Sequence, residues 1–130
     1  MPNPENGCSD LKEIFLNHVF NTGKNGWGAR WKRLAAISGA HTIGHAKPEN
    51  SGYDGFWGDP ANQGVFNNDY FRNIMTNGWG PQRAVNGNPE KNQWKLIDAS
   101  SSEEKGRQMM LNTDMCLFYQ DNRLHAECMD

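Results

Sequence analysis

A helical pattern over residues 29–46 carries a histidine on its apolar side. Leu34, Ile37, His41 and Gly44 follow one another at steps of three, four and three residues, which is the spacing of one face of an α-helix. Small residues at positions 39, 40 and 44 leave space beside the imidazole in which a flat, bulky group could approach it. The pattern predicts a buried helix that presents a histidine, although a histidine in such a place is more commonly a core side chain than a ligand.

A second histidine, His45, lies one helical turn after His41. This spacing can chelate a metal ion, but the sequence offers no obvious third ligand and no HExxH motif, so a zinc site is disfavoured. Cys8, Cys116 and Cys128 match no zinc motif either, because the chain has no CxxC pair. The three cysteines fit one disulfide and one free thiol in an exported protein, or three reduced thiols.

Turn-forming residues separate the helical patterns and make the chain loop-rich. Its 14 glycines and mean hydropathy of -0.85 are typical of a polar surface, while five Trp and six Phe favour a folded domain over a disordered chain. The pattern divides residues 1–130 into an amphipathic helix (8–20), the histidine-bearing helix (29–46), a loop (47–66), a short helix (67–76), a polar excursion (77–108) and a C-terminal segment (109–130). We expect a single, mainly α domain with long loops and at most a small β-hairpin around residues 94–97.

The charge balance and hydropathy exclude several kinds of partner. The formal net charge of -2 and the pI near 6.1 provide no basic surface for nucleic acid. The longest apolar run, around residues 34–37, is too short to cross a bilayer, and the start MPNPENG lacks the features of a signal peptide. These features predict a soluble protein that binds neither nucleic acid nor membrane, and they leave its compartment open.

An aspartate near the C-terminus lies in apolar company. Asp114 is part of the run MMLNTDMCL, and a carboxylate in such surroundings is destabilising unless it is paired. We therefore expect a partner such as a histidine N–H. No GxSxG, GxGxxG or Walker-type loop is present, so the sequence supports neither a serine hydrolase nor a nucleotide-binding protein.

Five blocks of the sequence resemble, in order and approximate spacing, those of the plant-type haem peroxidases. They lie between residues 34 and 120 and read LAAISGAHTIGHA, SGYDGFWG, VFNNDYF, QWKL and MMLNTD. The second block and the last two look closer to cytochrome c peroxidase than to ascorbate peroxidase, and Asn50 stands where ascorbate peroxidases carry an ascorbate-binding arginine. The resemblance implies a haem-peroxidase-like proximal domain.

The same resemblance implies roles for five residues. His41 would ligate the iron of haem b, and Asp114 would accept a hydrogen bond from its other ring nitrogen and increase the basicity of the ligand. Trp57 matches a tryptophan that stacks near the proximal histidine in both cytochrome c peroxidase and ascorbate peroxidase; ordinary core packing is the alternative. His45 and Lys47 lie where the family places groups near the haem propionates, and a solvated face is the alternative there.

The family's distal motif, an arginine followed by an aromatic residue and a histidine, is not found in this sequence. The run at 30–33 has no histidine where one is needed, and His18 has no suitable arginine before it. Without a distal histidine, the sequence offers no general base for the acid–base cleavage of hydrogen peroxide. We expect either a peroxidase whose distal half comes from another chain or segment, or a catalytically inactive structural or interaction module derived from a peroxidase. A protein partner or a second copy would then cover the missing distal face.

Overall fold

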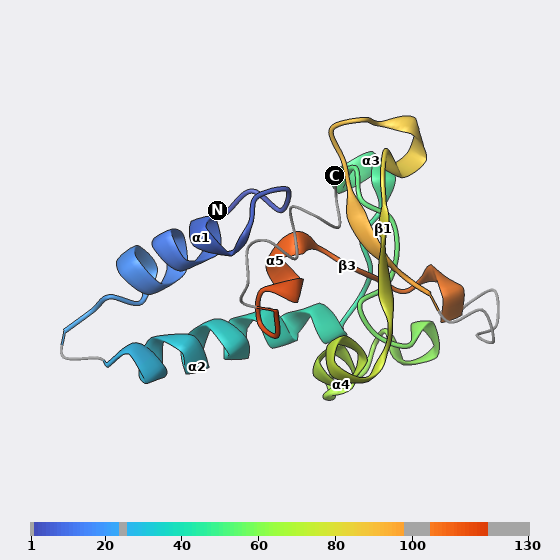
Figure 1. The fold of residues 1–130 in the computed structure, drawn as a ribbon. Coiled ribbons are helices and arrows are strands. Elements are labelled where there is room, and N and C mark those ends of the chain that lie inside the picture. The colour runs from blue at the N-terminus through green and yellow to red at the C-terminus, as the bar shows by residue number, and fades with distance from the viewer. Residues whose placement is uncertain (1, 24–25, 98–104, 120–130) are drawn as a thin grey trace.

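The computed structural model describes residues 2–23, 26–97 and 105–119, and its elements form two regions (Figure 1). In the first region, α1 (Cys8–Leu11) continues as the π-helix η1 (Lys12–Val19), and α2 (Trp27–Ser38) continues as the 3₁₀ turn η2 (Gly39–Thr42). The short helix α5 (Asn112–Met115) lies between these two helical arms. The second region holds a small antiparallel sheet with short helices around it, so the described part of the chain is mainly α, as expected.

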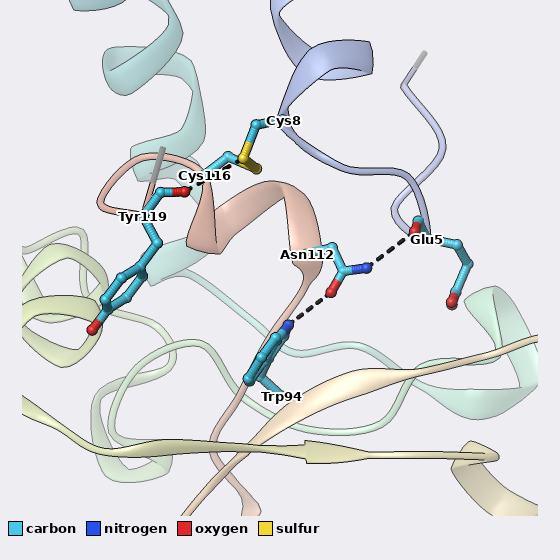
Figure 2. Close-up of a disulfide and its surroundings, with 6 residues drawn as sticks. All are labelled: Glu5, Cys8, Trp94, Asn112, Cys116 and Tyr119. Carbon is cyan, nitrogen blue, oxygen red and sulfur yellow. Dashed lines mark hydrogen bonds between the residues drawn. A yellow bond between two sulfur atoms is a disulfide. The ribbon is translucent and has the colours of Figure 1, made fainter. Parts of the chain in front are cut away.

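A disulfide and an apolar cluster join the two arms to the C-terminal part of the chain. Cys8 and Cys116 are bonded across a sequence separation of 108 residues, and both are fully buried (Figure 2). Around them lie Leu11, Leu16 and Leu34, also buried. Of the two alternatives that the sequence left open, the structure shows the disulfide for this pair and not reduced thiols. Cys128 lies outside the described residues.

The histidine-bearing helix begins earlier and ends earlier than expected. It starts at Trp27, and its α-helical part stops at Ser38, after which η2 carries His41. Gly44 has a φ of 75° and donates its N–H to the Gln63 carbonyl at 2.7 Å. Because Ile43 is already extended, with a φ of -105° and a ψ of 136°, and the left-handed Gly44 follows it, positions 43–46 belong to the following loop and the expected end at 46 is wrong. The glycines that leave space beside the imidazole are also poor helix formers.

The sheet exceeds the small hairpin expected from the sequence. Strands β1 (Trp79–Gln82) and β2 (Gln93–Leu96) pair antiparallel, and β3 (Met109–Met110) pairs with the other side of β2. The third strand has only two residues and lies within an apolar run with no alternation, which is why its sequence pattern does not indicate a strand.

The loop expected over residues 47–66 contains α3 (Pro48–Ser51) and the 3₁₀ turn η3 (Pro60–Asn62). Its close approach to the segment before β3 requires a glycine: Gly55 has a φ of 136°, and a Cβ there would lie 2.5 Å from the Arg107 carbonyl oxygen. The remaining elements are α4 (Asp69–Thr76), η4 (Val85–Gly87) and η5 (Lys105–Arg107).

The core of the second region lies between α4, the sheet and α5. Its buried members are Tyr70, Ile74, Trp79, Trp94, Met110 and Met115. Among the residues that the structure describes, no helix has the length and apolar character needed to span a membrane.

Candidate functional site

The carboxylate of Asp114 is the centre of a buried hydrogen-bond cluster. Its Oδ1 accepts from His41 Nδ1–H at 2.9 Å and from the Tyr70 hydroxyl at 2.8 Å. Its Oδ2 accepts from Trp57 Nε1–H at 2.7 Å and from the Leu111 backbone N–H at 2.8 Å. Asp114 is only 3% exposed, so these four donors replace the water that a carboxylate would otherwise bind.

Four different segments bring these side chains together. His41 comes from η2, Trp57 from the loop that follows α3, Tyr70 from α4 and Asp114 from α5. The His41 ring stacks on Trp57 with centroids 4.1 Å apart and an interplanar angle of 12°. The Tyr70 ring meets the same imidazole edge-on, with centroids 5.6 Å apart. The imidazole is therefore held between the face of one aromatic ring and the edge of another.

The cluster sets the charge of its members. Burial disfavours the charged forms of both His41 and Asp114, but their mutual attraction outweighs burial, so the pKa of His41 lies above 6.5 and that of Asp114 below 3.8. Burial and the neighbouring Asp114 carboxylate raise the pKa of Tyr70 well above 10.0. Asp114 is therefore ionised at neutral pH, and Tyr70 is a neutral hydroxyl donor.

An apolar hollow of about 210 Å³ opens beside His41. Its lining residues are Pro2, Pro4, Leu11, Phe15, Leu34, Ile37, Ser38, His41, Leu111, Thr113 and Asp114. Since Nδ1 of His41 is bonded to Asp114, Nε2 is the ring nitrogen available to a metal. The hollow is smaller than the roughly 300–1,000 Å³ of pockets that enclose a whole ligand, so it could cover one side of a flat apolar group.

The other two expected site residues do not join the Asp114 cluster. Nδ1 of His45 lies 3.1 Å from Gln63 Oε1, and its ring stacks on Phe56 at 4.6 Å. Lys47 is exposed at the start of α3. In residues 2–23, 26–97 and 105–119, no group of three or more His, Cys, Asp or Glu side chains is arranged to hold a metal ion.

Tyr70 is the member of the cluster that the sequence analysis does not single out. A signal exists in retrospect: Tyr70 and Ile74 are four residues apart on one face of α4, and both are fully buried. A buried tyrosine hydroxyl usually finds a hydrogen-bond partner, and Asp114 is one that the sequence leaves unpaired.

Three groups of known proteins resemble this chain. It is 31% identical over 117 residues to a protein of Pyricularia oryzae named "Putative heme-binding peroxidase", a match that covers 90% of this chain and 34% of that protein. It is 26% identical over 120 residues to the mitochondrial cytochrome c peroxidase of Yarrowia lipolytica, covering 90% of this chain and 28% of the relative. A match to the "Probable L-ascorbate peroxidase 3, peroxisomal" of Oryza sativa subsp. japonica is 36% identical over 76 residues, or 58% of this chain and 22% of the relative.

These matches support a plant-type haem peroxidase-like family for this chain. No family model matches it. The chain spans only 30–34% of the length of the three heme-binding peroxidases that it matches over 90% of its own length.

Proposed function

We propose that this chain provides the proximal side of a haem b site, in which His41 would be the ligand of the iron. The observation that carries the proposal is the arrangement of the His41 imidazole, which is bonded through Nδ1 to buried Asp114, stacked on Trp57 and placed beside an apolar hollow. Known relatives named as haem-binding and cytochrome c peroxidases support it.

Each residue of the cluster has a distinct part in this proposal. Bound haem would supply an iron centre able to react with hydrogen peroxide. His41 would bind that iron through Nε2, and Asp114 would hold the Nδ1 proton, which orients the ring and increases its basicity. Trp57 would keep the imidazole plane fixed by stacking. Lys47 and His45, which follow on the next loop, are our candidates for contacts with the haem carboxylates.

The test is a titration of the purified chain with haemin, followed by absorption spectroscopy, in the wild type and in His41→Ala. We expect a histidine-ligated spectrum that is lost in H41A. His18→Ala is the matched control, because it removes an exposed imidazole whose Nδ1 lies 2.7 Å from the Glu13 carbonyl oxygen and which does not contact Asp114. Equal spectra for the wild type and H41A, or loss of the spectrum in H18A alone, would rule out His41 as the ligand.

Peroxide-dependent oxidoreductase activity would then require a distal half from another chain or segment. Neither His18 nor the run at 30–33 fits the distal motif in sequence, and both are engaged in local contacts: Nδ1 of His18 lies 2.7 Å from the Glu13 carbonyl oxygen, and Arg30 donates to the Leu16 carbonyl at 3.1 Å. The alternative is an inactive peroxidase-derived module. That alternative would be supported if the chain binds haem but shows no peroxide turnover that depends on His41, even when its partner is present.

A further inference from the structure

We propose that Tyr70 is a positioning residue that weakens the hydrogen bond between Asp114 and His41 and thereby moderates His41 as an axial ligand. The effect of Tyr70 on the Asp114–His41 hydrogen bond concerns the haem-free chain, whereas its effect on His41 as a ligand rests on the proposed function. Four donors share the two oxygens of the Asp114 carboxylate.

Tyr70 and His41 bond to the same oxygen of Asp114. The Tyr70 hydroxyl lies 2.8 Å from Oδ1 and His41 Nδ1 lies 2.9 Å from it, whereas Trp57 and Leu111 bond to Oδ2. Two donors at one oxygen compete for its electron density, so each bond is weaker than it would be alone. Tyr70 is therefore the side chain placed to compete most directly with His41.

The direction of the Tyr70 bond is fixed by chemistry. An ionised carboxylate can only accept hydrogen bonds, so the phenol must donate its proton to Asp114. Tyr70 is fully buried, and its ring also contacts the imidazole edge-on. The hydroxyl thus has a defined partner and little freedom to turn away from it.

The strength of the Asp114–His41 bond determines how much negative character the imidazole carries. A stronger bond makes the histidine a better electron donor to a metal, which favours the oxidised metal. By drawing charge from Oδ1, Tyr70 limits this effect. Removing the hydroxyl should strengthen the bond to His41 and make the reduction potential of bound haem iron more negative.

Tyr70→Phe tests the inference, because it removes one oxygen and keeps the ring. Tyr53→Phe is the matched control: the Tyr53 hydroxyl also donates to a carboxylate, that of Glu5 at 2.6 Å, but not to Asp114. In the haem-free chain, we expect the NMR signal of the His41 Nδ1 proton to move downfield in Y70F and to stay in place in Y53F. In the haem-loaded chain, we expect a more negative reduction potential and a higher iron–histidine stretching frequency in Y70F alone.

A tyrosine whose hydroxyl served only to fill the core would change stability without moving these three readouts. Unchanged values in a folded Y70F variant would therefore overturn the inference. If Y70F does not fold, 3-fluorotyrosine at position 70 provides a second variant, since it keeps the hydroxyl and makes it a stronger donor. It should move the proton signal upfield, and an unchanged or downfield signal would contradict us. A wild-type chain that binds no haem through His41 would refute the proposed function, while the proton signal in the haem-free chain would still decide whether Tyr70 weakens the bond.

Discussion

A single buried carboxylate organises the site at the scale of residues. Asp114 is reached by side chains from three other segments, and each of them donates a hydrogen bond to it. Such a group stabilises the fold only while its partners are present, because an unpaired buried charge is strongly destabilising. The same carboxylate therefore serves both the fold and the proposed ligand.

Asp114→Asn should destabilise the haem-free chain. The variant loses the charge that attracts His41, and its amide NH₂ would face the donors Trp57 or Leu111. We expect the free energy of unfolding to fall by about 3 kcal/mol, near the lower end of the range for removing one partner of a buried charge pair. Urea denaturation measures this change. Asp54→Asn is the control, since that carboxylate is 37% exposed, against 3% for Asp114, and lies 3.7 Å from Arg107; we expect a loss below about 1 kcal/mol there. Equal losses in the two variants would contradict the central role of Asp114.

Ionisation of Tyr53 should lower the free energy of unfolding at alkaline pH. Burial and the nearby Glu5 carboxylate raise its pKa above the ordinary 10.0. A raised pKa in the folded state means that the contribution to stability is present below the unfolded pKa and is lost as the pH rises past it. The wild type should therefore lose stability more steeply than Y53F as the pH rises above about 10. Parallel pH profiles in denaturant unfolding would show that this hydroxyl contributes nothing.

Three residues of the site can be predicted from the sequence. His41 lies on a helix face with small neighbours, Asp114 needs a partner, and Trp57 belongs to a block that resembles the family. No local pattern indicates that the Tyr70 hydroxyl points at Asp114. That contact joins residues 44 positions apart and exists only after α4 and α5 have packed. A contact that forms only through tertiary packing leaves no local pattern in a single sequence.

At the scale of elements, the short helix α5 is held from several directions. Asn112 accepts a hydrogen bond from Trp94 Nε1–H at 2.7 Å and donates one to the Glu5 carbonyl at 3.0 Å (Figure 2). The disulfide from Cys116 to Cys8 fixes its other end. A four-residue helix has little stability of its own, so these contacts keep Asp114 in place.

Loss of the disulfide should therefore destabilise the whole chain. For a loop closed across 108 residues, the chain-entropy model gives about 4–5 kcal/mol. We expect Cys8→Ala with Cys116→Ala to lower the free energy of unfolding by that amount. The wild type unfolded in dithiothreitol should lie close to the double variant. A double variant as stable as the oxidised wild type would argue against the disulfide as a structural link.

The sequence predicts the type of the long elements better than their limits. The amphipathic pattern over 8–20 lies on α1 and η1, but periodicity does not reveal that η1 is a π-helix. The helical segment that follows α2 ends at Thr42, where Ile43 becomes extended, and the next residue, Gly44, is held by a bond to Gln63, 19 positions away. β3 is a strand because β2 lies beside it, and its own two residues carry no pattern.

At the scale of the whole molecule, the described residues form one wall of the proposed haem site. The hollow beside His41 is lined by α2, η1, α5 and the N-terminal segment, and it is too small to enclose both faces of a flat ligand. The rest of the site would have to come from a partner, a second copy or further chain.

The haem-loaded chain alone should therefore be a poor peroxidase. General acid–base catalysis typically contributes about 10²–10⁴-fold, and we expect that factor to be missing. Turnover of hydrogen peroxide with a phenolic donor should stay near that of free haemin. A rate two or more orders of magnitude higher would mean that this chain supplies its own distal base.

The most direct test of the central claim is the iron–histidine stretching band in the resonance Raman spectrum of the reduced, haem-loaded chain. We predict a band in the wild type and in H18A, its absence in H41A, and a lower frequency in D114N, because Asn cannot accept a hydrogen bond from Nδ1–H as strongly as a carboxylate. A band that persists in H41A would contradict the account, and so would a wild-type chain that binds haem and has no such band.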